Sequence, residues 1–218
     1  MSRSNRSNRK LPKPEYFSWL VEYKIENLKE MVSSVESDLN GVRNSKKTEI
    51  EKASPERYDL EHDYFTHMDC LNEEILQLKE VEDISKKLAV VGLYMVVETF
   101  TKQIMKCFYQ DLDGKTKKKK LHTLHKWDVL KDKLNVLCGL DLSEISEFSV
   151  IDELRCLNNV IKHSGYVDEK LAVFLTWKDD IGKEIDVDKI ELEKFYISIP
   201  KYIHDMAEKI NDSFIKTE

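Results

Sequence analysis

The sequence is poor in the residues that make turns. It holds six glycines and four prolines in 218 residues, which is less than half of the roughly 12% that these two residue types usually supply. Sandwiches and barrels of β-strands need many turns and therefore many of these residues. By contrast, 35% of the chain is charged, as is common in long solvated helices. We therefore predict an all-α protein.

The residues of three common kinds of site are also missing. Neither a CxxC pair nor a glycine-rich phosphate loop of the P-loop or dinucleotide type is present. A zinc knuckle or a redox pair cannot form locally, and scattered thiols fit a reducing compartment. We expect no metal, no cofactor and a cytoplasmic location. The four single cysteines are Cys70, Cys107, Cys138 and Cys156.

Long apolar runs are absent as well. The longest uncharged apolar stretch, from Leu88 to Val97, is about half of the roughly 20 residues that span a bilayer. The N-terminal sequence MSRSNRSNRK leads into LPKPEYF and not into the apolar core of a signal peptide. The sequence therefore predicts neither a transmembrane segment nor a secretion signal.

Positive charge is concentrated in two segments of an otherwise acidic chain. The net charge is −6, yet residues 1–13 carry five basic groups and residues 114–120 carry five lysines, without an acidic residue in either. Such segments can contact phosphates. A solvated disordered tail and a loop kept in water by its lysines are the plainer alternatives.

Apolar residues recur at spacings of three and four over most of the chain, which predicts helices. Asn40-Gly41 is expected to end the first helix, Ser54-Pro55 to open the second, and Pro200 to kink the last. A capping box from Ser149 to Asp152 is expected to open a helix that ends before Gly165. Residues 170–187 fit a small β-hairpin. The expected helices cover 15–39, 55–82, 84–112 (of which 88–108 is the buried central part), 124–137, 149–164 and 190–215.

One of these helices carries a polar stripe suited to chemistry. Arg155, Asn159 and His163 recur every four residues, so they share one side of the helix. Arginine can clamp phosphoryl charge, asparagine can orient a phosphate, and histidine can transfer a proton near neutral pH. In the structural alternative, Arg155 pairs with Asp152 or Glu153 of a neighbouring chain and His163 caps the helix end.

The layout of the chain resembles the HEPN superfamily over about residues 55–216. The resemblance lies in a long helix pair, a lysine-rich break, a short segment with Trp127, the sequence ELRCLNNVIKHSGYV and a final amphipathic helix. It implies a helical bundle and a homodimer. Many HEPN proteins are metal-independent endoribonucleases of toxin-antitoxin or antiviral systems, in which an arginine and a histidine on one helix meet a second copy across the dimer.

Carried over to this chain, the resemblance makes His163 the general acid or base, Arg155 the transition-state stabiliser and Asn159 the residue that positions RNA. Seven residues separate Arg155 from His163, which is more than the four to six of the family motif. The alternative is therefore a catalytically inactive HEPN-like module that dimerises or binds a partner protein. Further RNA contacts are expected from Asn158, Lys162, Tyr166, Lys117, Lys118, Lys119 and Lys120.

These observations divide the chain into three parts. Residues 1–13 are expected to form a disordered basic tail, residues 14–54 an N-terminal helical extension, and residues 55–218 a HEPN-like helical domain. The expected partners are RNA, a second copy of the chain, and an antitoxin or another defence-system protein. No contact with a membrane is expected.

Overall fold

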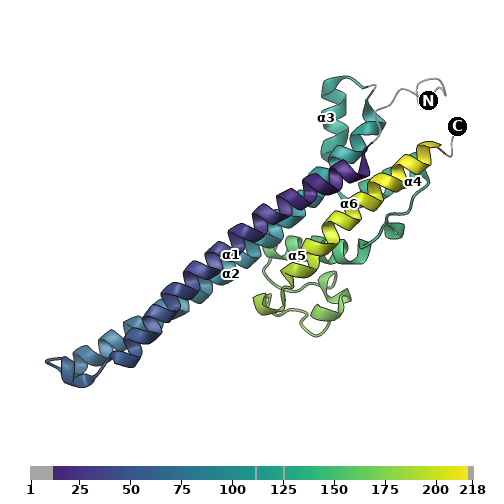
Figure 1. Cartoon of the computed structure of the whole chain (residues 1–218). Coiled ribbons are helices and arrows are strands. Elements are labelled where there is room, and N and C mark those ends of the chain that lie inside the picture. Colours follow the sequence, from purple (N-terminus) through teal and green to yellow (C-terminus); the bar gives the residue numbers. More distant parts are fainter. Residues whose placement is uncertain (1–11, 111, 125, 216–218) are drawn as a thin grey trace. The chain divides into compact units, whose positions relative to one another are not determined.

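Helices make up most of the described part of the chain. The computed structural model describes residues 12–110, 112–124 and 126–215, and over these residues it has six α-helices and no strand (Figure 1). The all-α prediction is therefore confirmed, whereas residues 1–11 of the expected basic tail lie outside the described residues. The helices are α1 (Pro14–Lys52), α2 (Glu61–Met105), α3 (Gly114–Thr123), α4 (Trp127–Cys138), α5 (Phe148–His163) and α6 (Leu192–Ile215).

The helices belong to two compact units. The smaller unit comprises Asn27–Ala89, and the larger unit comprises the described residues before Asn27 and after Ala89. The long helices α1 and α2 each contribute to both units. Every residue of the predicted polar stripe lies in the larger unit.

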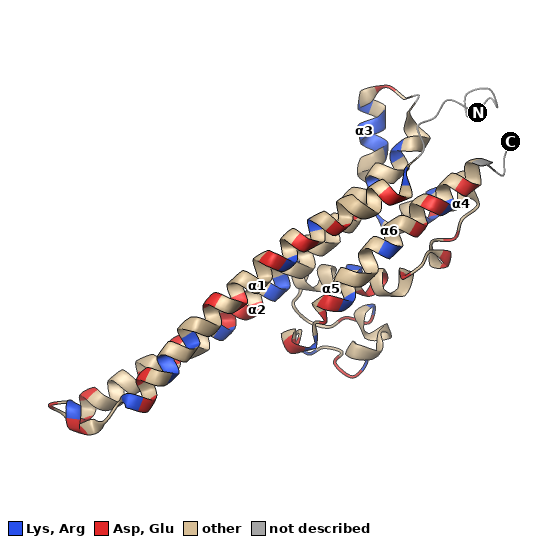
Figure 2. Cartoon of the chain, viewed as in Figure 1, with Lys and Arg blue, Asp and Glu red and all other residues tan. Residues whose placement is uncertain are grey.

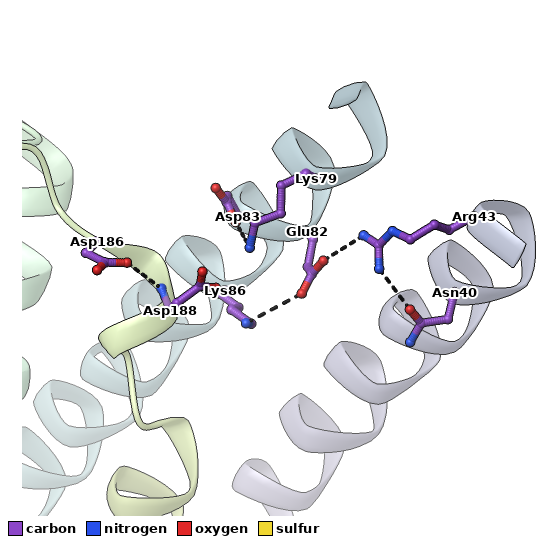
Figure 3. Close-up of polar contacts among 8 residues, drawn as sticks. All are labelled: Asn40, Arg43, Lys79, Glu82, Asp83, Lys86, Asp186 and Asp188. Carbon is purple, nitrogen blue, oxygen red and sulfur yellow. Dashed lines mark hydrogen bonds and ion pairs between the residues drawn. The ribbon is translucent and has the colours of Figure 1, made fainter. Parts of the chain in front are cut away.

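The smaller unit is an antiparallel helical hairpin whose two helices are joined by polar contacts as well as by buried apolar side chains such as Leu71. Arg43 of α1 donates to Glu82 of α2 over 2.8 Å and to Asn40 over 2.9 Å, as Figure 3 shows. The hydrogen bond from Arg43 holds the pKa of Glu82 below its usual range. Further along the hairpin, Lys46 lies 2.6 Å from Glu74.

Two of the expected helix boundaries in this hairpin are wrong. Gly41 lies inside α1, which continues to Lys52. An interior glycine costs a helix only about 1 kcal/mol, and the contacts of the hairpin can offset that cost. Ser54-Pro55 opens only a 3-10 turn, Pro55–Arg57, in which the Ser54 side chain caps no backbone group.

The two long helices expected over 55–82 and 84–112 are one helix. Helix α2 runs from Glu61 to Met105 without a break at Asp83–Ser85. No glycine or proline stands there to interrupt the hydrogen-bond ladder. By length and composition the stretch Glu61–Tyr109 could also cross a membrane, and half of its most apolar window is buried within the protein.

The core of the larger unit forms where α2, α5 and α6 contribute their apolar faces. Leu93, Ile104, Leu154, Ile199 and Tyr202 are among the side chains with almost no exposed surface. Helix α6 continues through Pro200, and α5 packs against it. The expected burial of the central helix is confirmed for about half of its residues after Leu88, which is itself exposed.

The lysine stretch expected as a loop is the helix α3. The carboxylate of Asp113 accepts from the backbone N–H groups of Lys115 (3.1 Å) and Thr116 (3.0 Å) and so caps its first turn. Lysine has a good helix propensity, and the exposed surface keeps its charge in water. The blue side of α3 in Figure 2 marks these lysines.

The β-hairpin expected over residues 170–187 is also wrong. The segment forms the 3-10 turns Leu171–Val173 and Leu175–Trp177, and its one β-type pairing is an isolated bridge between Tyr166 and Glu184. The carboxylate of Asp168 accepts from the N–H of Leu171 over 2.8 Å. Such side-chain bonds give the backbone an alternative to a strand ladder.

The core of the larger unit predicts a clear stability effect. Replacing Leu154, which is fully buried, with alanine should lower the free energy of unfolding by about 2–5 kcal/mol, because a cavity remains in the packing. Urea denaturation followed by circular dichroism measures this change. Val136→Ala, at an exposed site on α4, is the matched control and should shift the free energy by less than about 0.5 kcal/mol. Equal effects of the two substitutions would contradict the assigned core.

Candidate functional site

Helix α5 carries the predicted stripe. Its C-terminal end was predicted correctly and its N-terminal end was not. The expected end is confirmed: α5 stops at His163, the N–H of Gly165 bonds to Val160 O over 2.8 Å, and Gly165 has a φ of 72°. The expected capping box is wrong, because α5 begins at Phe148, after Glu147 with a φ of 62°.

The left-handed conformation of Glu147 is held by α6. Its carboxylate accepts from Ser198 Oγ over 3.1 Å and lies 3.7 Å from Lys201 Nζ. A positive φ is unfavourable for a residue with a side chain, so these contacts compensate for the strain. They fix the point at which α5 starts.

Arg155 is held by its own helix and by α4. Its guanidinium donates to Asp152 over 2.7 Å and to Cys156 Sγ over 3.1 Å, and it lies 5.4 Å from the ring centroid of Trp127. Its side chain is 17% exposed. Burial is the largest single influence and lowers the pKa of Arg155, but the bond to Asp152 and the electrostatic effects of the neighbouring groups together outweigh it, so the pKa is raised.

The other stripe residues have different surroundings. Asn159 and His163 are exposed, as is Lys162. Eight residues of helix place His163 about 12 Å from Arg155 along the axis. Asn159 and His163 therefore expose their side chains to solvent, whereas the side chain of Arg155 is mostly covered.

Asn158 is the least accessible of the predicted substrate contacts. It is buried, and its Oδ1 has no hydrogen-bond partner among the described residues. Its Nδ2 lies 3.5 Å from Asn159 Oδ1. Tyr166, by contrast, is exposed just beyond the helix end, where its N–H bonds to Ser164 Oγ over 3.2 Å.

The four predicted lysines lie on α3 and point in different directions. Lys117 and Lys118 line a hollow of about 500 Å³ between α3 and the C-terminal part of α2. Lys120 lies 5.7 Å from the ring centroid of Tyr109, and Lys119 is exposed. Within the described residues, no group of three His, Cys, Asp or Glu side chains could hold a metal ion.

A buried carboxylate on α5 was not anticipated from the sequence. Glu153 accepts from the indole Nε1 of Trp177 over 3.2 Å and pairs with Lys194 of α6 over 2.5 Å. Glu153 shares a helical face with Leu157 and Val160, and that pattern could have indicated a buried acid in need of partners. The contact joins α5 to α6 and to the segment that follows α5.

That segment, residues 164–191, we call the strap. Trp177 buries its ring, and Asp180 is paired with Lys183 over 3.0 Å and with Lys189. Backbone bonds tie Val167 to Lys183 over 2.9 Å. The strap nevertheless exposes apolar side chains to solvent, namely Val173, Leu175 and Ile181.

Comparisons with known proteins give no relative. No family model, no curated protein and no solved structure matches this chain.

Two thiols with a raised pKa predict a selective pattern of alkylation. Burial raises the pKa of Cys156 to about 11, despite the opposing charge of Arg155, and burial also raises the pKa of Cys138 to about 11. The thiolate is the reactive form, so at pH 8 both should react with iodoacetamide more than about 100-fold more slowly than an ordinary thiol.

Mass spectrometry of the folded protein checks this pattern. Cys70, which is exposed, is the internal control and should be modified first, and all four cysteines should react after denaturation. Rapid labelling of Cys156 in the native state would show that Arg155 activates the thiol and would contradict the burial described here.

Proposed function

We propose that the protein is a helical binding module that pairs with a second copy of itself through the strap and the end of α5. The observation that carries this proposal is the contrast within the strap. Its backbone is tied down, yet Val173 and Leu175 are 75% and 89% exposed. Apolar side chains on a fixed backbone are typical of interaction surfaces.

A second copy is the occupant that fits this surface. A two-fold interface places the same patch on both sides, so the patch must complement itself. Apolar side chains such as Leu175 and Val173 meet that requirement, whereas a patch of one charge does not. The resemblance of ELRCLNNVIKHSGYV to the HEPN superfamily, whose members pair through this helix, supports the same arrangement.

The surroundings of Arg155 favour a binding role over catalysis. To clamp a phosphoryl group, Arg155 would have to leave Asp152 at 2.7 Å and the ring of Trp127. Its charge already has a partner. In each chain His163 is then the one side chain of the stripe that can transfer a proton near neutral pH.

A metal-independent endoribonuclease is the second candidate, favoured by the exposure of one end of α5. Asn159, Lys162, His163 and Tyr166 are all accessible there. Pairing of two copies would add a second His163, which gives the acid and the base that cleavage by a 2'-hydroxyl needs. In this case the activity would be that of a toxin or antiviral effector, and an antitoxin or another defence protein would restrain it.

The pairing surface is tested by placing charges on it. Leu175→Glu combined with Val173→Glu should convert a dimer to a monomer, because two buried carboxylates per chain would lack partners. Light scattering at several concentrations measures the mass. Val136→Glu, at an exposed site on α4, is the matched control and should leave the dimer intact. A monomeric wild-type protein, or a dimer that survives the double substitution, would contradict the proposal.

Incubation with RNA separates the two candidates. The binding module predicts that RNA stays intact in EDTA even at high protein concentration, and that His163→Ala changes nothing. Gel analysis of a mixed-sequence RNA shows the outcome. Metal-independent cleavage that disappears in His163→Ala would establish the nuclease, and Arg155→Lys would then show whether the guanidinium takes part.

A further inference from the structure

Three aromatic side chains lie exposed near the start of α1. Tyr16, Trp19 and Tyr23 are 55%, 59% and 55% exposed, and spacings of three and four place them on one side of the helix. Phe17 points elsewhere, since its ring meets that of Phe100 edge-on at 6.2 Å. The packing of α1 therefore does not depend on the three exposed rings.

These three rings form what we call the aromatic ladder. The ring centroids of Tyr16 and Trp19 are 6.5 Å apart, and those of Trp19 and Tyr23 are 6.4 Å apart with planes inclined by 19°. Seven residues of helix make the ladder about 10 Å long. Successive exposed rings of this kind offer π-faces on which flat aromatic groups can stack.

The ladder begins at a hollow that also contains lysines. Tyr16 lines a hollow of about 1090 Å³ together with Lys106, just after α2, and Lys117 of α3. The same two lysines line the adjoining hollow of about 500 Å³. The other cationic or titratable side chains of this second hollow are Lys102, Lys118 and His122.

The second hollow gathers positive charge from two elements that face each other. Its described lining residues include no carboxylate, although Lys102 has Glu98 at 3.7 Å. The first hollow has one acidic lining residue, Glu15. A run of solvated lysines would spread its charge around a helix, whereas here lysines of α2 and α3 converge on one space.

We propose that the aromatic ladder and the lysine hollows together bind single-stranded nucleic acid without sequence preference. Bases stack on Tyr16, Trp19 and Tyr23, while Lys106 and Lys117 contact the phosphates that follow. Aromatic platforms beside a cationic groove are the combination by which proteins hold single strands. The proposal goes beyond the pairing of two copies and uses no residue of α5 or the strap.

The charge of the hollows argues against a second copy as the occupant of this surface. Two-fold pairing on the ladder would bring the lysines of one copy toward those of the other, and like charges across an interface cost several kcal/mol. A duplex fits poorly as well, because its bases already stack on one another. A single strand supplies both the unstacked bases and the negative charge.

Fluorescence anisotropy with a labelled oligouridine tests the ladder. The Trp19→Ala, Tyr23→Ala double variant should raise the Kd by tenfold or more, since base stacking on an aromatic ring is worth about 1–3 kcal/mol per base. Phe65→Ala, which removes an exposed ring from the other unit, is the matched control and should not change the Kd. An unlabelled duplex should compete poorly.

The salt dependence of binding tests the hollows. The Lys106→Gln, Lys117→Gln variant should reduce the slope of log K against log salt by about 1.4, because each contact with a single-strand phosphate contributes about 0.7. The matched control, Lys115→Gln with Lys119→Gln, removes two charges of α3 that line neither hollow, and it should reduce the slope by less.

Three results would overturn this proposal. The first is that the oligouridine fails to bind at about 50 mM salt, where phosphate contacts are strong. The second is that it binds the ladder variant as tightly as the wild-type protein. The third is that light scattering shows a loss of oligomeric state in the ladder variant, which would make the ladder a protein interface. None of these results depends on the strap variants, so failure here and failure of pairing through the strap are distinguishable.

Discussion

The larger unit depends on one buried carboxylate. Glu153 lies on the core side of α5 and accepts from Trp177 Nε1 and Lys194 Nζ. A buried charge is costly without partners, and removing one partner of such a pair typically costs about 3–5 kcal/mol. The main effect of the carboxylate is therefore to specify the arrangement of the segments around it, more than to add to the free energy of unfolding. It requires that the strap return to α5 and that α6 present a lysine at the same point.

This requirement explains how an irregular segment keeps a fixed surface. The strap has neither helices of useful length nor strands, and such segments are usually the first to open. Here the ring of Trp177, the pairs of Asp180 and the backbone bonds of Val167 hold it. Val173 and Leu175 can therefore remain exposed in a defined position, which a mobile loop could not achieve.

The sequence predicted the helices well because their signals are periodic. The spacing of apolar residues predicted α6, and Gly165 predicted the end of α5 at His163. The errors lie where tertiary contacts compete with local signals. Gly41 is a good helix stop, but α1 continues through it. The mostly apolar run at 171–177 fits a strand, but side-chain bonds and the burial of Trp177 hold this segment in 3-10 turns.

The candidate site was predictable in part for the same reason. Spacing placed Arg155, Asn159 and His163 on one side of α5, but it could not show that Asp152 and Trp127 hold the guanidinium. The aromatic ladder was missed because Tyr16, Trp19 and Tyr23 resemble core residues by type. Their exposure depends on which face of α1 meets α2, and that is a property of the packing.

Hydrogen exchange at the strap tests the central claim most directly. If Glu153 and its partners fix the strap, the amides of Val167, Gly182 and Ile185, which donate to backbone carbonyls, should exchange slowly in the wild-type protein. In Glu153→Ala they should exchange rapidly while the amides of α6 stay protected. Rapid exchange of these three amides in the wild-type protein would show that the strap is not held, and would contradict the account.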